Sequence, residues 1–306
     1  MSTQTVAILL STYNGARFLG EFLESLEAQT VREFDLVVRD DGSSDGTRAI
    51  LAAFGARLSI RELPCDGNRG AALSFIKLLE TSGDGYDHYM FADQDDVWYP
   101  DKVERAIARL RQCGHMTPSL YFSKLEIVDE ALHHIRCSRS LRVFDFSNVL
   151  VENVATGCTI AINAAARKLI LESMPARMLM HDWWCHLVVS ALGTVLFDPT
   201  PTLKYRQHDA NVVGSARGFF DETTRRVRRF VKGRKSGVFG VSDQAAELLR
   251  CHSSRLSAAQ ISAINELLAG KATFGGRLSL ALGGRFVRQH TIDTLILRVL
   301  FLINRY

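Results

Sequence analysis

Short apolar runs alternate with helical patterns along the first 130 residues, which is typical of a parallel sheet covered by helices. Residues 5–10 (TVAILL) form a nearly continuous apolar strand, as burial on both faces of a sheet requires. Segments rich in β-branched and aromatic residues predict five further strands, over residues 34–39, 57–63, 86–91, 120–128 and 154–162.

Between these strands, apolar residues recur every three or four positions and predict amphipathic helices. The predicted helices cover residues 18–26, 47–54, 71–80 and 181–192, and a further one starts at Pro100, where proline is favoured in the first helical position. From about residue 218 onward only helical patterns remain. The pattern therefore predicts an α/β domain over residues 1–216 and a helical region over residues 217–306.

Length and composition agree with a globular protein. The chain has 306 residues, 47% hydrophobic and 23% charged, which excludes a disordered or low-complexity protein. No apolar run approaches the ~20 residues that span a bilayer, and the longest one, at residues 295–303, contains Arg298. The N-terminus lacks the basic and apolar regions of a secretory signal, so we expect a cytosolic protein. The six cysteines show no CxxC pair, which predicts reduced and mostly buried thiols.

Charge is unevenly distributed along the chain. Residues 217–306 contain 16 basic and six acidic residues, whereas residues 1–216 contain 21 basic and 27 acidic ones. This contrast predicts a carboxylate-bearing catalytic domain followed by a segment that meets an anionic partner.

Two acidic clusters follow predicted strands, where ligands bind in open α/β sheets. In Asp40–Gly46 (DDGSSDG), glycine and serine permit a tight turn whose carboxylates can bind a base or ribose; a capped turn without function is the alternative. In Asp93–Asp96 (DQDD), three carboxylates repel one another, and a Mg2+ or Mn2+ ion that bridges to a diphosphate would relieve the repulsion. The alternative is a solvated loop that caps the next helix.

A third cluster opens the helix predicted at residues 181–192. In His181–His186 (HDWWCH), Asp182 can serve as a general base in a pocket shaped by two tryptophans, because apolar surroundings raise the proton affinity of a carboxylate. An N-capping aspartate followed by core aromatics explains the spacing equally well. Zinc is not expected, because no further ligand stands at a recognisable spacing.

Two weaker signals complete the set. In Tyr205–His208 (YRQH), Arg206 can neutralise phosphate, and His208 can bind phosphate or complete a metal shell; a structural role stays open for both. Asn68-Arg69-Gly70 opens a predicted helix, whose N-terminal amides favour anions. Neither a Walker sequence nor GxGxxG occurs in the chain.

The order of these motifs resembles the inverting glycosyltransferases of family 2, which have the GT-A fold. STYNG follows the first strand, DDGSSDGT the second and DxDD the fourth, and an Asp-Trp motif precedes a helix. The resemblance covers about residues 5–215. FADQDDVW, NVATGC (residues 153–158) and YRQH with the following Asn211 and Gly214 are most similar to the bacterial rhamnosyltransferase branch.

Transferred to this sequence residue by residue, the resemblance implies a nucleotide-sugar half over about residues 1–96 and an acceptor half over residues 97–216. The implied nucleotide site has Ser11, Thr12 and Tyr13 around the base, Asp41 as the base's hydrogen-bond partner, Asn68 beside them and Asp93 on the ribose side.

The resemblance also implies the residues that carry out the chemistry. Asp95 would ligate the metal ion, Mg2+ or Mn2+, and His208 would be a second metal or phosphate contact. Asp182 matches the catalytic base of the family's Glu-Asp pair, although His181 precedes it here. Further candidates for contacts with the diphosphate or the acceptor are Arg206, Gly157, Trp183 and Trp184.

The expected activity follows from these roles. Asp182 would deprotonate an acceptor hydroxyl, which would attack the anomeric carbon and invert it while the metal ion stabilises the departing diphosphate. The branch implies L-rhamnose from dTDP-rhamnose, with a UDP-sugar as the other donor, and a lipid-linked glycan acceptor in bacterial surface polysaccharide synthesis. The alternatives are a nucleotidyltransferase that makes a nucleotide sugar, or an inactive GT-A-fold scaffold at the membrane.

The basic C-terminal region predicts a surface for an anionic partner. Between residues 217 and 235, Arg225, Arg226, Arg228, Arg229 and Lys232 flank Val227, Phe230 and Val231. Near the end, apolar residues from Ile292 to Ile303 keep helical spacing beside several arginines. Such segments suit anionic membranes, so we expect a peripheral protein on the inner face of the cytoplasmic membrane. Packing on the catalytic domain and a homodimer are the alternatives, and nucleic acid is not expected because stacking aromatics are missing.

Overall fold

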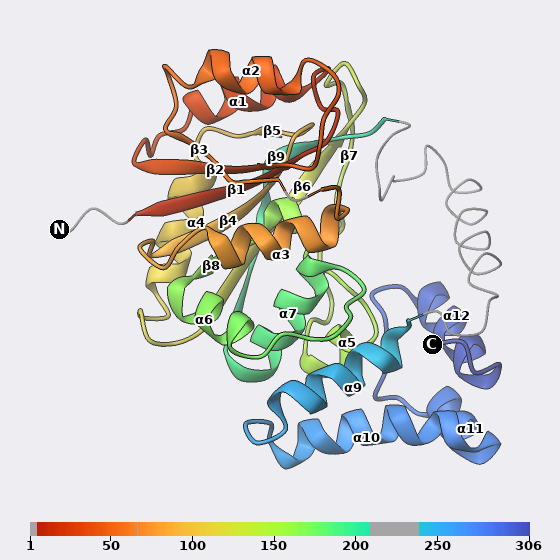
Figure 1. The fold of residues 1–306 in the computed structure, drawn as a ribbon. Helices are drawn as coiled ribbons and strands as arrows, with labels where there is room; N and C mark the ends of the chain where they lie inside the picture. Colours follow the sequence, from red (N-terminus) through yellow and green to blue (C-terminus); the bar gives the residue numbers. More distant parts are fainter. Residues whose placement is uncertain (1–4, 66, 209–238) are drawn as a thin grey trace.

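The computed structural model describes residues 5–65, 67–208 and 239–306. In this part of the chain one nine-stranded sheet has the order β3-β2-β1-β4-β8-β6-β9-β5, and β7 pairs with β6 (Figure 1). The strands are β1 (Val6–Thr12), β2 (Phe34–Asp40), β3 (Ile60–Glu62), β4 (His88–Asp93), β5 (Val97–Trp98), β6 (Ser119–Val128), β7 (His134–Cys137), β8 (Ala161–Asn163) and β9 (Thr194–Arg206).

Helices cover both faces of the sheet. Figure 1 shows α1 and α2 above it and α3, α6 and α7 below it. The helices of the first 208 residues are α1 (Leu19–Glu27), α2 (Thr47–Phe54), α3 (Ala71–Thr81), α4 (Lys102–Arg111), α5 (Phe146–Val149), the 3-10 turn η1 (Gly157–Thr159), α6 (Ala164–Glu172) and α7 (His181–Leu192).

Strand β1 shows why the sheet is buried on both sides. Its alternate residues Val6, Ile8 and Leu10 join the apolar core under α1 and α2, whereas Ala7 and Leu9 join the core on the α3 side. Side chains along a strand point alternately to opposite faces, so a strand between two helical layers must be apolar at every position. β1 pairs in parallel with β2 and β4, and their carboxyl ends therefore lie at one edge of the sheet.

The second half of the sheet is mixed. β6 pairs in parallel with β9, whereas β8 lies antiparallel between β4 and β6, and the short β5 and β7 pair antiparallel with β9 and β6. The helices predicted at residues 47–54 and 181–192 coincide with α2 and α7. The helix predicted to start at Pro100 is α4, which begins two residues later, after Asp101.

The strand predicted at residues 154–162 was largely wrong. Only residues 161–163 form a strand, β8, because the preceding residues turn through η1. In that turn the Thr159 N–H and hydroxyl both donate to the Thr156 carbonyl, so β-branched residues serve a tight turn here instead of a strand. The expectation of mostly buried cysteines was also wrong: all six are free thiols, but only Cys158 and Cys185 are buried.

The C-terminal part that the structure describes is helical, as predicted. It consists of α9 (Val241–His252), α10 (Ala258–Ala272), α11 (Phe274–Leu282) and α12 (Thr291–Leu302). Glu247 on α9 accepts a bond from the Ala176 N–H (2.7 Å), and Gln260 on α10 donates to the Ala191 carbonyl (2.7 Å). These bonds attach the helices to the ends of α7. The predicted basic segment at residues 217–235, with Asn211 and Gly214, lies outside the described residues.

Among the residues that the structure describes, no helix is both long and apolar enough to cross a membrane.

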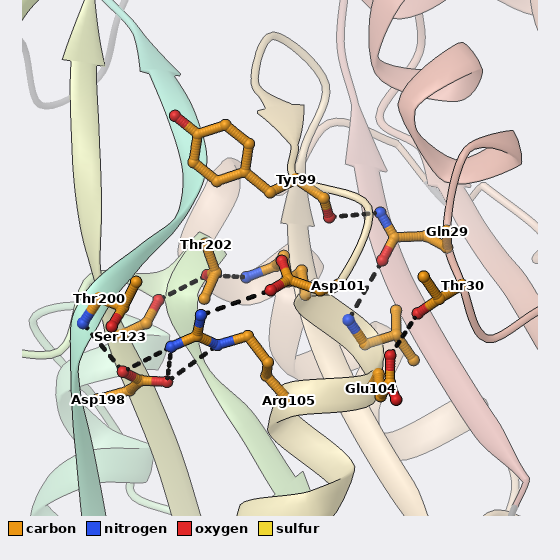
Figure 2. Close-up of polar contacts among 12 residues, drawn as sticks. Gln29, Thr30, Tyr99, Asp101, Glu104, Arg105, Ser123, Asp198, Thr200 and Thr202 are labelled. Carbon is orange, nitrogen blue, oxygen red and sulfur yellow. Dashed lines mark hydrogen bonds and ion pairs between the residues drawn. The ribbon is translucent and has the colours of Figure 1, made fainter.

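A polar network fastens α4 to the sheet (Figure 2). Asp198 on β9 accepts hydrogen bonds from Arg105 Nη2 (2.8 Å), the Tyr121 hydroxyl (2.9 Å) and the Thr200 N–H (2.9 Å). Burial raises the pKa of Asp198, but these hydrogen bonds outweigh it and leave the pKa below its usual value of 3.8. On the other side of α4, the Gln29 amide donates to the Tyr99 carbonyl (2.9 Å) and accepts from the Val103 N–H (3.2 Å).

We predict that Asp198→Asn lowers the free energy of unfolding by about 2 kcal/mol at pH 7, because Arg105 and Tyr121 lose their charged acceptor. The low pKa of Asp198 in the folded state means that its contribution exists above about pH 4 and is lost as pH falls further. Urea unfolding at pH 7 and pH 3.5 measures both effects. Asp101→Asn is the matched control, since Asp101 meets the same arginine at 3.4 Å from an exposed position; an equal loss in both variants would contradict the assignment.

Candidate active site

The loop after β2 is organised by a buried carboxylate, Asp40. It accepts hydrogen bonds from the Thr12 hydroxyl (2.9 Å), the Ser43 N–H (3.0 Å) and Arg48 Nε (3.0 Å). Burial alone would raise the pKa of Asp40, but the hydrogen bonds from Ser43, Arg48 and Thr12 lower it by more. The pKa therefore lies below its usual value of 3.8, and the carboxylate is ionised at neutral pH. Thr12, which was predicted to line the nucleotide site, is fully buried, and its hydroxyl holds Asp40 in place within this loop.

The next carboxylate, Asp41, connects β2 to the start of α3. It forms an ion pair with buried Arg39, and its Oδ2 accepts from the Arg69 N–H (3.0 Å) and the Gly70 N–H (2.9 Å). The anion that we expected at the N-terminus of this helix is thus the chain's own Asp41 carboxylate. The Asn68 side chain accepts from the Gly70 N–H (3.1 Å) in the same turn, so the structure brings Asp41 and Asn68 together.

Ser11 and Tyr13 lie at the carboxyl end of β1, beside these loops. The Ser11 hydroxyl bonds to the Ser74 hydroxyl at 2.7 Å. The Tyr13 ring is half exposed, and its backbone N–H and carbonyl bond to the Gln94 side chain at 3.0 and 3.1 Å. A Cβ on Gly15 would collide with the end of the Gln94 side chain, so a larger residue there would displace Gln94 from its bonds to Tyr13.

The DQDD segment after β4 concentrates carboxylates in a buried place. Ligand atoms of Asp93, Asp96 and Cys158 lie within 4.8 Å of one another, and a buried oxygen of Asp96 has no hydrogen-bond partner. Burial, and then the charge of Asp95, raise the pKa of both Asp93 and Asp96, that of Asp93 to about 7. Asp95 Oδ2 lies 2.7 Å from His208 Nε2, so the two predicted metal residues meet.

This donor set fits a divalent metal ion. Carboxylate oxygens and an imidazole nitrogen suit Mg2+ or Mn2+, and a cation would satisfy the unpaired oxygen of Asp96 while relieving the repulsion. Cys158 was not among the predicted site residues, although the NVATGC motif contains it. No pattern in the sequence indicated that residues 158 and 93–96 would meet, since a long segment separates them.

Two buried cations flank the carboxylates. Lys102 on α4 was not among the predicted site residues. It donates from Nζ to the Cys158 carbonyl (2.9 Å) and the Thr202 hydroxyl (3.4 Å). Arg206 donates from Nε to the Asp95 carbonyl (2.9 Å) and from Nη2 to Glu21 (2.7 Å), and it also reaches the Glu130 carbonyl. Arg206 thus holds the backbone of the DQDD segment, and a contact with a diphosphate would require it to release these partners.

Asp182 lies in the first turn of α7 and is nearly completely buried. Its carboxylate accepts from the Gly157 N–H (3.1 Å) and the Trp183 N–H (2.6 Å), and the Asn153 side chain bonds to it as well. Burial outweighs these bonds and raises the pKa of Asp182 to about 6. Its charge also raises the pKa of Asp93, so the carboxylates of α7 and β4 belong to one electrostatic site.

The aromatic neighbours of Asp182 differ from expectation. Trp184 is completely buried and points towards His252 of α9 (ring centroids 6.5 Å apart), so the structure does not bring it to the site. Trp183 is partly buried and donates from its indole nitrogen to the Val149 carbonyl (2.7 Å). His181 stacks on Phe75 at 4.2 Å. Within the described residues, the candidate metal group is Asp93, Asp96 and Cys158, which includes neither the histidines nor the cysteine of this motif.

Comparison with known sequences identifies the family. Residues 7–174, more than half of the chain, match the profile of the domain described as glycosyl transferase family 2. A dTDP-rhamnosyl transferase of Shigella flexneri is 29% identical over 223 residues, which cover 67% of this chain and 74% of that protein. A glycosyltransferase of Rickettsia typhi without a described activity is 26% identical over 224 residues, 71% of this chain and 68% of that protein.

Solved structures support the predicted fold. S. aureus TarS (residues 1–349) in complex with UDP-GlcNAc aligns with a TM-score of 0.59 at 17% identity, over 98% of this chain and 81% of that one. A mannosyltransferase of Pyrobaculum calidifontis, in complex with GDP-Man and Mn2+, aligns with a TM-score of 0.53 at 16% identity, over 98% and 80%. The predicted GT-A fold with C-terminal helices is confirmed. The chain belongs to glycosyl transferase family 2 and is a glycosyltransferase.

Proposed function

We propose that this enzyme is a metal-dependent inverting transferase that moves L-rhamnose from dTDP-rhamnose to a hydroxyl of a lipid-linked glycan in bacterial surface polysaccharide synthesis. One observation carries the proposal: a carboxylate cluster suited to a metal ion and a separate buried carboxylate, Asp182, act on each other electrostatically across one site. The 29% identity to a dTDP-rhamnosyl transferase supports rhamnose over other sugars.

The donor side of the site is the end of β4. Asp93, Asp95 and Asp96, with His208, would hold the metal ion, and Arg206 fixes the backbone of the segment that carries them. When bound, a divalent ion supplies positive charge that offsets the charge developing on the leaving diphosphate. Asp41 and Tyr13, at the ends of β2 and β1, flank the place for the nucleotide.

The acceptor side is the start of α7. A carboxylate with a pKa of about 6 is mostly ionised at pH 7, and it is a stronger base than an exposed aspartate. The N–H groups of Gly157 and Trp183 hold it in one orientation. Asp182 would take the proton of the acceptor hydroxyl, whose oxygen forms the new bond to the anomeric carbon as the bond to the diphosphate breaks on the opposite face. A single displacement of this kind inverts the configuration.

Donor and metal are tested together by calorimetric titration of dTDP-rhamnose, UDP-glucose, UDP-GlcNAc and GDP-mannose, first with Mn2+ and then with EDTA. We expect dTDP-rhamnose to bind about tenfold or more tightly than the others, and its affinity to drop in EDTA. Asp95→Asn should remove the metal-dependent part of the affinity, whereas Asp84→Asn, an exposed loop position, should not. Preference for another donor would refute rhamnose, and equal affinity in EDTA would refute the metal.

The base is tested with Asp182→Asn. An amide keeps the shape of the side chain but cannot take a proton, so we expect turnover to fall by about 1,000-fold while donor affinity stays within a few-fold. In the parent enzyme, turnover should be half-maximal near pH 6, because Asp182 must lose its proton, and should level off above about pH 7. Near-normal turnover in the variant would exclude Asp182 as the base.

Gly157→Ala tests the support of the base. A Cβ there would lie 3.0 Å from His181 Nε2 and 3.5 Å from the Asp182 Cβ, and His181 cannot yield easily because it is buried against Phe75. We expect kcat to fall about tenfold or more, with a smaller change in the KM of the donor. Gly20→Ala on α1, with open space around it, is the matched control and should leave kcat unchanged. Unaltered kcat in a folded Gly157→Ala enzyme would contradict this role.

A further inference from the structure

Exposed large apolar side chains gather on the last two helices. Of thirteen such residues in the described part of the chain, eight fall between residues 274 and 303. They are Phe274, Leu278 and Leu282 on α11, Ile292, Leu295, Val299 and Leu302 on α12, and Ile303 directly after it. The two helices pack against each other at the lower right of Figure 1. We call the exposed apolar residues of this helix pair the α11–α12 face.

Helix α12 carries apolar residues on two opposite sides, one exposed and one buried. Ile292, Leu295 and Val299 are three and four residues apart and lie on one side, which is exposed. Leu297 and Phe301 lie on the opposite side and are buried in the core. A surface helix of a water-soluble protein normally has a polar outer side, so the outer side of α12 is built for an apolar environment. On α11 the exposed residues are four apart and continue that surface.

The charge around this face selects the partner. Residues 271–306 contain six basic residues and a single acidic one, Asp293, which is buried. Arg285 and Arg305 are exposed, and Arg277 and Arg298 are partly exposed. Arg285 also pairs with Glu266 of α10 (2.7 Å), and Lys271 lies 3.5 Å from Asp243 of α9. An apolar surface bordered by cations complements the interface of an anionic bilayer. A symmetric dimer would instead place the same cations opposite one another, because each subunit contributes the same patch.

We propose that the α11–α12 face docks on an anionic lipid surface, with its apolar side chains at the depth of the headgroup boundary and its arginines at the phosphates. The helices lie on the membrane and do not cross it. The sequence had suggested two membrane-binding segments, residues 217–235 and the apolar stretch from Ile292 to Ile303. The α11–α12 face contains the second of them and adds the exposed residues of α11.

The docking face is linked to the acceptor side of the active site. The segment that enters α12 is bonded to the one that follows α5: Arg288 Nε donates to the Val151 carbonyl (3.0 Å), and the Gln289 N–H donates to Glu152 (2.7 Å). Asn153, next in the chain, bonds to Asp182. A lipid-linked acceptor would thus be held in the membrane beside the base; this last point rests on the proposed function, whereas lipid binding does not.

The test is sedimentation of the full chain with vesicles of phosphatidylcholine alone or with phosphatidylglycerol, without donor or acceptor. We expect binding to the anionic vesicles that weakens with salt. The triple variant Leu282→Ser, Leu295→Ser and Val299→Ser should bind about tenfold or more weakly. Arg285→Gln with Arg305→Gln should lose about fivefold per arginine. The matched control is Leu73→Ser, Met116→Ser and Ile135→Ser, which removes exposed apolar residues elsewhere and should bind like the parent.

Three results would overturn the proposal. These are absence of vesicle binding by the parent, equal binding to neutral vesicles, and equal losses in the test and control triple variants. A parent that sediments as a dimer in the ultracentrifuge, and becomes monomeric in the test variant, would assign the face to a second copy of the chain instead. Calorimetric donor binding by each variant reports on the active site separately, so failure of the lipid proposal and failure of the glycosyltransfer proposal are distinguishable.

Discussion

Repulsion among the buried carboxylates at the end of β4 is the constraint around which the rest of the site is arranged. Asp93, Asp95 and Asp96 lie where β4 ends, Asp96 buried and the other two partly buried. Desolvation adds to the effect of the neighbouring carboxylates in raising the pKa of Asp93 and Asp96. Ionised groups so placed need positive charge or a proton. The fold supplies part of that charge through its own cations. Under the proposed function, a divalent metal ion would supply the rest and would let the carboxylates hold the anionic diphosphate of the donor.

The permanent part comes from two buried cations that hold backbone. Lys102 donates to the carbonyl of Cys158, and Arg206 to the carbonyl of Asp95. Each cation therefore holds a backbone segment of the site in place and also partly offsets the negative charge of the nearby carboxylates. α4, which carries Lys102, is fastened to β9 through Arg105 and Asp198 (Figure 2). A stable hydrogen-bond network thus lies directly behind the chemically active edge of the sheet.

The sequence was sufficient to predict those parts of the structure that a periodic pattern or the end of a strand determines. The apolar β1 and the helices α2 and α7 follow from residue spacing, whereas the approach of Asp95 to His208 was implied by the resemblance to family 2. Prediction from the sequence failed where tertiary contacts determine the local conformation or the position of a side chain. Residues 154–160 have strand composition but turn so that the Gly157 N–H can meet Asp182. Trp184 lies two residues after Asp182 in the sequence yet packs in the core, because helical geometry turns it towards α9.

His181, where the family usually has glutamate, follows from the same electrostatic constraint. The imidazole is buried against Phe75 and Phe91, and burial lowers its pKa to about 3, so it is neutral at physiological pH. A glutamate in this apolar place would add a charge beside Asp182, whose own charge already raises the pKa of Asp93. A neutral ring fills the same space without raising the pKa of Asp182 above the range in which it can act as a base at pH 7. Under the proposed function, the departure at position 181 therefore leaves Asp182 able to act as the base.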